Sequence, residues 1–253
     1  MTTTTSTCHR SCVTNLGCVT VRIRRVTTTR AGGFSAPPYD TFNLGDNVGD
    51  EPEAVAANRK RLAAAIGLDE DRVIWMNQVH GDRVCMVDGP RRTPVEDTDA
   101  IVTTMPGLAL AVVTADCVPV LLADARAAVV AAVHAGRVGA QRGVVARAVE
   151  AMLACGAHPE DVSVLLGPAV SGPNYEVPEQ MAATVEAALP GSRTPSSRGT
   201  AALDLRAGIA RQLRDLGVGA IDADPRCTVA DPMLFSHRRD AVTGRLASLV
   251  WME

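Results

Sequence analysis

The stretch from residue 108 to residue 143 most constrains the fold of this chain, because apolar runs follow one another closely in it. Two of them, Leu108–Ala115 and Val118–Ala123, lack the alternation of apolar and polar residues that a half-exposed strand shows. They are therefore predicted to be strands buried on both faces. A third run, Ala128–Val133, ends in His134-Ala135-Gly136 and leads into a helix start flanked by glycines.

Residues with reactive side chains interrupt these runs. If Val118–Asp124 and Ala127–His134 pair as a hairpin with Ala125-Arg126 as its loop, paired positions sum to 251 and Cys117 lies opposite His134. A thiol and an imidazole would then meet within reach of one metal ion or one proton. The loop lacks an Asn-Gly type of sequence, so a register shifted by one or two residues stays open. A buried structural cysteine and an unrelated histidine are the simpler alternative.

Length and composition favour one globular domain. The 253 residues with 47% hydrophobic content allow a substantial core. Strands and helices are predicted to mix without strict alternation or segregation, which indicates a single layered α/β (α+β) domain of mixed sheets over residues 19–253. Residues 1–18 are rich in threonine and serine and are predicted to be a disordered tail. Helices are predicted at residues 53–66, 144–153, 179–189 and 204–216, and a flexible linker at 190–200. A short strand is predicted at residues 73–76, which leads into the segment 77–82 and is continued by residues 84–87.

Composition also limits the partners and the location. The net charge of -3, the lack of a basic run and the aromatic content of 3% give no reason to expect nucleic acid. No apolar run reaches the roughly 18 residues of a membrane span, and the start lacks the apolar core of a secretory signal. The seven cysteines have no framework spacing, which predicts reduced thiols in a cytoplasmic protein. A monomer is the expected state.

Three separated segments resemble the signatures of a known family. They are Asn77-Gln78-Val79-His80-Gly81, Thr114-Ala115-Asp116-Cys117-Val118-Pro119 and Val133-His134-Ala135-Gly136. In this order, and with further matching segments over about residues 20–252, the chain is similar to the YfiH-like family. That family was formerly described as polyphenol oxidases or laccases and is now regarded as purine nucleoside-metabolising enzymes. The further segments are Arg30–Gly33, Asn43–Gly45, Val48–Asp50, Asn58-Arg59, Gly167-Pro168, Tyr175–Val177 and Phe235–Arg239.

The resemblance implies a YfiH-like (CNF1-like) fold of mixed sheets packed with helices. It also implies that His80, Cys117 and His134 bind one metal ion, usually zinc, with copper as the other candidate. Two imidazoles and one thiolate suit Zn²⁺ and leave a fourth position for water or substrate, which is typical of a catalytic site.

The implied activity is phosphorolysis of adenosine, inosine, guanosine and, as a further candidate, methylthioadenosine, which releases the base and ribose 1-phosphate. Adenosine deamination is implied as well, and a zinc-bound water of lowered pKa suits it. The partners would be purine nucleosides and phosphate. Asp116 joins the three ligands as a candidate catalytic residue. Neighbours on a strand point to opposite faces, however, so a supporting or structural role for Asp116 is equally open.

Phosphate and nucleoside also need binding groups. Arginine is the natural clamp for phosphate, and Arg59, in the family's Asn-Arg helix segment, is the first candidate. Arg238 and Arg239 are further candidates for binding phosphate. Either could instead stabilise the C-terminal loop. Asn43 and Asn77, in matching segments, are candidate substrate-binding residues. The chain departs from the family at Arg137, where tryptophan is common, and at Ala169, where cysteine is frequent. These departures bear on the pocket and not on the three metal ligands.

Three other functions stay open. A copper-dependent phenol oxidase could use the same ligands, although five histidines in the whole chain are few for several copper sites. A cysteine hydrolase would use Cys117 as nucleophile and His134 as base. A non-catalytic binding protein would use the metal only as a staple. Chelation of the metal would inactivate the zinc enzyme. Alkylation of Cys117 would inactivate the hydrolase. Removal of the metal would unfold the binding protein.

Overall fold

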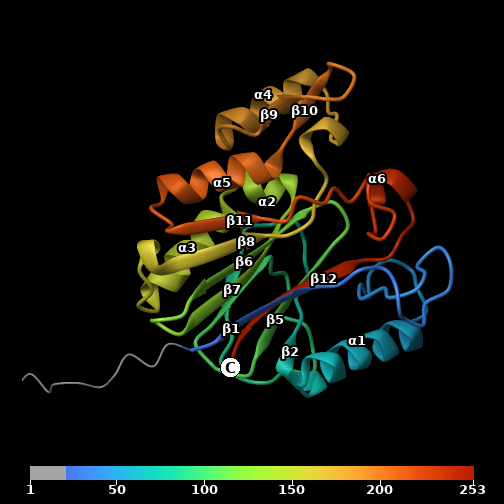
Figure 1. Ribbon diagram of the computed structural model, residues 1–253, viewed down its shortest axis with the longest axis vertical. Helices are drawn as coiled ribbons and strands as arrows, with labels where there is room; N and C mark the ends of the chain where they lie inside the picture. The colour runs from blue at the N-terminus through green and yellow to red at the C-terminus, as the bar shows by residue number, and fades with distance from the viewer. Residues whose placement is uncertain (1–20) are drawn as a thin grey trace, which may run out of the picture.

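The computed structural model describes residues 21–253, so the tail predicted at residues 1–18 lies outside the described residues. The fold is mixed α/β, with three sheets packed with helices, as the sequence predicts. Two of the sheets stack face to face, and helices cover their outer faces (Figure 1). Across residues 21–253, no helix is both long and apolar enough to span a membrane.

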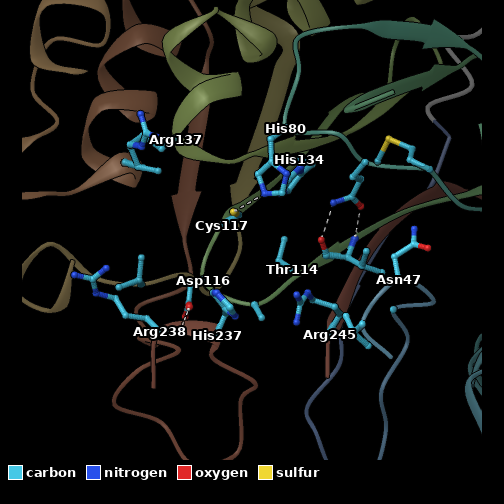
Figure 2. Close-up of a pocket in the computed structure, with 18 of the residues that line it drawn as sticks. Asn47, His80, Thr114, Asp116, Cys117, His134, Arg137, His237, Arg238 and Arg245 are labelled. Atoms are coloured by element: carbon cyan, nitrogen blue, oxygen red, sulfur yellow. Dashed lines mark hydrogen bonds between the residues drawn. The ribbon is translucent and has the colours of Figure 1, made fainter. Parts of the chain in front are cut away.

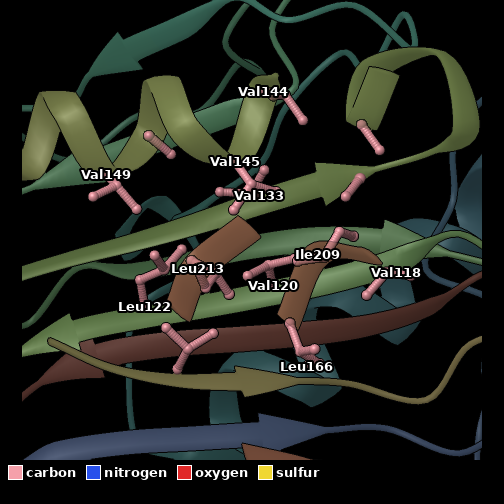
Figure 3. Packing of buried hydrophobic residues seen from close by; sticks show 14 of the residues in the cluster. Val118, Val120, Leu122, Val133, Val144, Val145, Val149, Leu166, Ile209 and Leu213 are labelled. Atoms are coloured by element: carbon pink, nitrogen blue, oxygen red, sulfur yellow. The ribbon is translucent and has the colours of Figure 1, made fainter. Parts of the chain in front are cut away.

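The larger sheet contains the apolar runs that were predicted to be buried. Strand β6 (Val118–Asp124) pairs with β7 (Val129–Ala135) in an antiparallel hairpin, and both strands are buried along their whole length. Val120 and Val133 face the helices (Figure 3), whereas Leu121 faces the second sheet. Both faces of the hairpin are thus apolar, which explains the missing alternation. The sheet has the order β11-β8-β6-β7-β4-β3, and its other strands are β3 (Val84–Met86), β4 (Ala100–Thr103), β8 (Val162–Leu166) and β11 (Ala220–Ala223).

The smaller of the two stacked sheets joins the first and the last strand of the described chain. Strand β12 (Leu246–Met252) lies between β1 (Ile23–Thr27) and β5 (Ala109–Thr114) and is antiparallel to both. Strand β2 (Val73–Ile74) completes the order β1-β12-β5-β2. Register pairs Leu246 with Thr114, so the residues just before β12 and just after β5 come close together.

Helices close both outer faces. Helix α1 (Pro52–Ile66) covers the four-stranded sheet over nearly the predicted residues 53–66, and Gly67 caps its end with a φ of 75°, the left-handed conformation that favours glycine. Helices α3 (Val144–Ala154) and α5 (Leu205–Asp215) cover the six-stranded sheet, where Val149 and Leu213 pack against β6 and β7 (Figure 3). The shorter helices are α2 (Arg137–Gln141), α4 (Glu179–Ala188) and α6 (His237–Asp240).

The predicted register of the β6–β7 hairpin is wrong by two residues. Paired positions sum to 253, so Pro119 and not Cys117 lies opposite His134. The loop spans four residues, 125–128, because the Asp124 carboxylate accepts the N–H groups of Arg126 and Ala127 and extends the turn. Cys117 therefore lies just before β6 and outside the ladder.

Two further expectations are wrong. The segment at residues 190–200, predicted as a flexible linker, carries β9 (Arg193–Pro195), which pairs with β10 (Ala201–Leu203) in a two-stranded sheet. The Glu186 carboxylate accepts the N–H groups of Gly191 and Arg193 and so fixes the start of this hairpin. Strand β3, expected to continue β2, instead joins β4 in the six-stranded sheet, because the chain crosses from one sheet to the other between them.

Candidate metal and active site

Three side chains able to bind a metal ion meet at one end of the stacked sheets. His80 lies in the loop after β2, Cys117 in the bend between β5 and β6, and His134 on β7. Their ligand atoms all lie within 4.8 Å of one another. The two imidazole rings are nearly perpendicular, with centroids 4.7 Å apart. The structure thus brings together the three residues predicted to bind metal.

Left-handed backbone conformations at His80 and Asp116 shape this site. Their φ angles are 59° and 95°, which residues other than glycine seldom adopt. Asp116 lies in a bend and not in a strand, so the side chains of Asp116 and Cys117 both line the same cavity. This corrects the expectation, based on strand geometry, that the two would point to opposite faces. The Asp116 carboxylate accepts hydrogen bonds from the Thr228 hydroxyl at 2.6 Å and the Arg238 N–H at 2.7 Å.

Asp99 is a site residue that sequence reasoning missed. It is fully buried, and its Oδ1 lies 2.7 Å from Nδ1 of His134. The same carboxylate accepts the N–H groups of Val79, His80 and Gly81. One side chain therefore orients the His134 ring and fixes the loop that carries His80, as carboxylates commonly do for metal-binding histidines. The available signal was an acidic residue immediately before the buried strand β4.

The Cys117 thiol and the His134 imidazole favour each other's charged forms. Burial alone would raise the pKa of Cys117, but the neighbouring imidazoles, chiefly His134, lower this pKa to about 6. Burial would likewise lower the pKa of His134, but the Cys117 thiolate and the Asp99 carboxylate raise it to about 9. At neutral pH the metal-free pair is therefore a thiolate beside an imidazolium. A sulfur that is already deprotonated is the form that binds a metal ion.

Gly136 leaves room for the three ligands. A Cβ at this position would lie 2.9 Å from Cδ2 of His80 and 3.2 Å from Sγ of Cys117. These distances are shorter than carbon and sulfur atoms tolerate without displacement. The glycine after His134-Ala135 is therefore a requirement of the site and not only of the turn into α2.

A cavity of about 820 Å³ opens beside the three ligands (Figure 2). This volume is in the range of small-molecule sites, about 300–1,000 Å³. Gln78 lines this cavity, and its amide is held by two 2.8 Å hydrogen bonds to the backbone of Val113. Besides the ligands, the polar side chains of the wall are Asp46, Asn47, Gln78, Thr114, Asp116, Arg137, Tyr175, His237, Arg238 and Arg245.

Arg238 and Asp116 are the predicted site residues, beyond the three ligands, that line this cavity. Nη2 of Arg238 donates to the carbonyl of Glu176, and its guanidinium lies 5.2 Å from the ring centroid of Tyr175. Tyr175 and Arg245, which sequence reasoning did not select as site residues, lie in the same wall. Arg245 had no local signal, because only the pairing of β12 with β5 brings it here.

The other predicted binding residues lie outside the cavity lining. Arg59 donates from Nε and Nη2 to the carbonyl of Leu44, pairs with Asp46 at 3.2 Å, and stacks 4.2 Å from the ring centroid of Trp75. Nε and Nη2 of Arg59 are thus used inside the fold, and the structure does not bring this side chain to the metal ligands.

Asn43, Asn77 and Arg239 likewise make contacts within the protein. Asn43 is fully buried and bonds to the backbone of Gly45 and Arg245. Asn77 donates to Glu96, and Arg239 donates to backbone carbonyls of the loop before α6, among them that of Thr228. Asn43 does not line the cavity itself, but it positions Gly45 and Arg245, which do.

Comparison with known proteins gives consistent matches along the chain. The model of a family described as multi-copper polyphenol oxidoreductase laccase matches residues 24–253. The chain is 76% identical over 237 residues to a Mycobacterium tuberculosis protein named purine nucleoside phosphorylase, a match that covers 94% of this chain and 95% of that protein. A Corynebacterium glutamicum protein of the same name is 56% identical over 232 residues, covering 91% and 94%. Among solved structures, Bacillus licheniformis hypothetical protein YfiH superposes with a TM-score of 0.86 at 31% identity, covering 91% and 93%.

Proposed function

The chain belongs to the family described as multi-copper polyphenol oxidoreductase laccase, with YfiH-like relatives, and we propose that it is a metal-dependent purine nucleoside phosphorylase. One observation carries the proposal. His80, Cys117 and His134 converge on a cavity large enough for a nucleoside, in a chain that shares most of its sequence with relatives named for this activity.

The donor set fits zinc. Two imidazole nitrogens and one thiolate sulfur are ligands that Zn²⁺ prefers, and three protein ligands are typical of a catalytic ion. Asp99 holds His134 through Nδ1, so Nε2 is the nitrogen left for the metal. Copper accepts the same donors. When bound, the ion would supply Lewis acidity beside the substrate and, for deamination, a water of lowered pKa.

In the proposed reaction, an oxygen of inorganic phosphate forms a bond with C1′ of the ribose while the C1′–N9 bond breaks. The electron pair of the broken bond leaves with the base, which gains a proton from the phosphate or from solvent. Burial, aided by the nearby Cys117, raises the pKa of Tyr175, so its phenol stays protonated and can donate a hydrogen bond. Asp116, fixed by Thr228 and the Arg238 backbone, can accept one from a substrate N–H or hydroxyl.

Adenosine deamination is the second proposed activity of the same site. It replaces the amino group at C6 with a hydroxyl from water and releases ammonia. The ligand set supports it because three protein ligands leave a position for water next to the cavity. It does not require phosphate, and this difference separates the two activities in one assay.

A cysteine hydrolase is the alternative that a specific observation favours. The thiolate–imidazolium pair of Cys117 and His134 is what an activated nucleophile needs. Such an enzyme would keep its activity after metal removal and lose it on alkylation. We do not propose phenol oxidation, because five histidines in the sequence are too few for several copper sites.

The experiment is chromatography of adenosine and inosine incubated with metal-quantified protein, with and without phosphate, beside Cys117→Ala. The proposal expects phosphate-dependent release of adenine or hypoxanthine that is lost in the variant together with the bound zinc. Inosine formed from adenosine without phosphate would add deamination. Absence of turnover in zinc-loaded protein would reject both activities and leave the hydrolase or a metal-stapled binding protein.

We further propose that residues 19–253 act as one domain, as a cytoplasmic monomer. The described cysteines, Cys85, Cys117, Cys155 and Cys227, are free thiols, which supports a reducing compartment. Size-exclusion chromatography with light scattering tests the oligomeric state.

A further inference from the structure

Among the described residues, Arg245 is one of three arginines in the cavity wall, and the fold fixes its stem beside a buried hydroxyl that has no partner there. Nη1 donates to the carbonyls of Thr243 and Gly244, the two residues that precede it. Within residues 21–253, Nε and Nη2 have no acceptor and no carboxylate pairs with this side chain. Arg238 likewise donates from one nitrogen, to the carbonyl of Glu176, but it is exposed, and Arg137 donates from Nη1 to the Gln141 side chain. A positive charge is therefore available at the Arg245 end of the cavity.

Backbone hydrogen bonds and the neighbouring Gly45 fix the position of Arg245. The buried Oδ1 of Asn43 accepts the N–H of Arg245 at 2.8 Å and that of Gly45 at 3.0 Å. The N–H of Leu44 donates to the carbonyl of Arg245. A Cβ at Gly45 would lie 2.6 Å from Cγ of Arg245, so only glycine lets the side chain pass into the cavity. The Asn43-Leu44-Gly45 segment thus positions one arginine.

The surroundings of Arg245 suit an anion. Figure 2 shows Thr114 between Arg245 and the three metal ligands, and the register pairs Thr114 with the residue after Arg245. The Thr114 hydroxyl is buried and has no hydrogen-bond partner in the described part of the chain. A buried polar group without a partner is costly, and a bound oxyanion would supply one.

No carboxylate of the cavity wall forms an ion pair with Arg245 in the described residues. Of the two carboxylates in the wall, Asp46 is paired with Arg59, and Asp116 accepts from Thr228 and the Arg238 backbone. Burial lowers the pKa of Arg245 and outweighs the opposing effects of Cys117, Asp116 and Tyr39. The guanidinium therefore lies within electrostatic range of the metal ligand Cys117. The side chain keeps its charge at any physiological pH.

We propose that Arg245 is the principal contact for the inorganic phosphate co-substrate, which it binds between its Nε–Nη2 edge and the His80–Cys117–His134 cluster. This inference rests on the proposed phosphorolysis, for which it names the anion subsite. The Nε–Nη2 edge of a guanidinium presents two parallel N–H donors, the geometry that matches two phosphate oxygens. Arg59, the first candidate from the sequence, cannot fill this role without breaking its contacts to Leu44 and Asp46.

The test is steady-state kinetics of phosphate-dependent base release, with phosphate varied at saturating inosine and inosine varied at saturating phosphate. The variants are Arg245→Gln, Arg245→Lys, Gly45→Ala and, as a control with the same change of charge, Arg214→Gln on the exposed face of α5. Loss of a charged hydrogen-bond pair is expected to raise the KM for phosphate at least about 10-fold in R245Q, and less in R245K. In the Arg245 variants, the KM for inosine and the zinc content should stay within about 3-fold of the parent. In R214Q, the KM for phosphate should also stay within about 3-fold of the parent.

Gly45→Ala keeps every charge and displaces only the arginine stem. If R245Q fails to fold, the KM for phosphate of Gly45→Ala still tests the inference. A raised KM for phosphate in either variant supports the inference. An unchanged KM for phosphate in the folded variants, or a rise confined to the KM for inosine, overturns it.

A direct titration separates this inference from the proposed function. If the zinc-loaded parent does not phosphorolyse nucleosides, the proposed function fails, and calorimetric titration with inorganic phosphate decides the inference. Binding to the parent that is weakened at least about 10-fold in R245Q supports an anion site at Arg245. Equal binding to both proteins, or none to the parent, overturns it.

Discussion

Oδ1 of Asp99 lies 2.7 Å from Nδ1 of His134, and both side chains are buried. This contact fixes which ring nitrogen of His134 is free for a metal ion. Because the same carboxylate also accepts three N–H groups of the loop around His80, two of the three ligands depend on it.

Replacing Asp99 with asparagine is expected to weaken zinc binding by about 10- to 100-fold, because the amide cannot hold the imidazole and all three N–H groups as a carboxylate does. Competition with a chromophoric chelator measures the zinc affinity. Asp88→Asn, at an exposed position, is the matched control and should bind zinc like the parent. Parent-like affinity in D99N would show that Asp99 is only structural.

Replacing Gly136 with alanine is expected to reduce zinc affinity by at least about 10-fold, because the new Cβ would crowd His80 and Cys117. The backbone at Gly136, with φ of −72°, tolerates alanine, so crowding is the only cost. Gly89→Ala, where a Cβ would meet nothing within 4 Å, is the control. Equal zinc content in the two variants after dialysis would contradict the crowding argument.

The reactivity of Cys117 in metal-free protein should depend on pH with a midpoint near its pKa of about 6. The pKa is lowered, so the thiolate is present above the midpoint and is lost as pH falls through it. Iodoacetamide labelling from pH 5 to pH 8, followed by peptide mass spectrometry, measures this rate. His134→Ala should move the midpoint upward toward the ordinary thiol value, and bound zinc should protect the thiol. A midpoint that does not respond to H134A would rule out the pairing.

Replacing Thr114 with valine removes a buried hydroxyl that has no partner in the described residues. Without phosphate, the variant is expected to be as stable as the parent or more stable by about 1 kcal/mol. Added phosphate should then raise its melting temperature less than that of the parent. The matched control is Thr103→Val, whose hydroxyl donates to the carbonyl of Val87 at 2.7 Å, so this variant should lose stability. Equal phosphate effects on T114V and the parent would remove Thr114 from the anion site.

The helices and strands of this fold were largely predictable from the local pattern of apolar residues, but the pairing of the strands was not. Helix α1 and the buried strands β5, β6 and β7 follow from periodicity and from apolar runs. The hairpin register failed because it depends on the side chain of Asp124, which enlarges the loop by capping it. A pattern of apolar residues carries no information about such a turn.

In the site, too, some residues were predictable from the sequence and others were not. Cys117 and His134 were joined by an argument from the sequence, and the resemblance to a known family supplied His80. Asp99 and Arg245 went unnoticed because their roles arise from pairings between distant strands, β4 with β7 and β5 with β12. Arg59 was selected because it lies in the family's Asn-Arg segment and arginine suits phosphate, yet its side chain bonds to Leu44 and stacks on Trp75 within the fold.

The loop that carries His80 also determines how a metal ion could leave. His80 is exposed, whereas His134 is buried on a central strand, and the N–H groups of Val79, His80 and Gly81 anchor the loop to one carboxylate. Opening this short loop removes one ligand and leaves both sheets intact. Metal exchange is therefore expected to proceed at the rate of a local fluctuation, far faster than global unfolding. A metal ion at this site could thus enter and leave without separation of the stacked sheets.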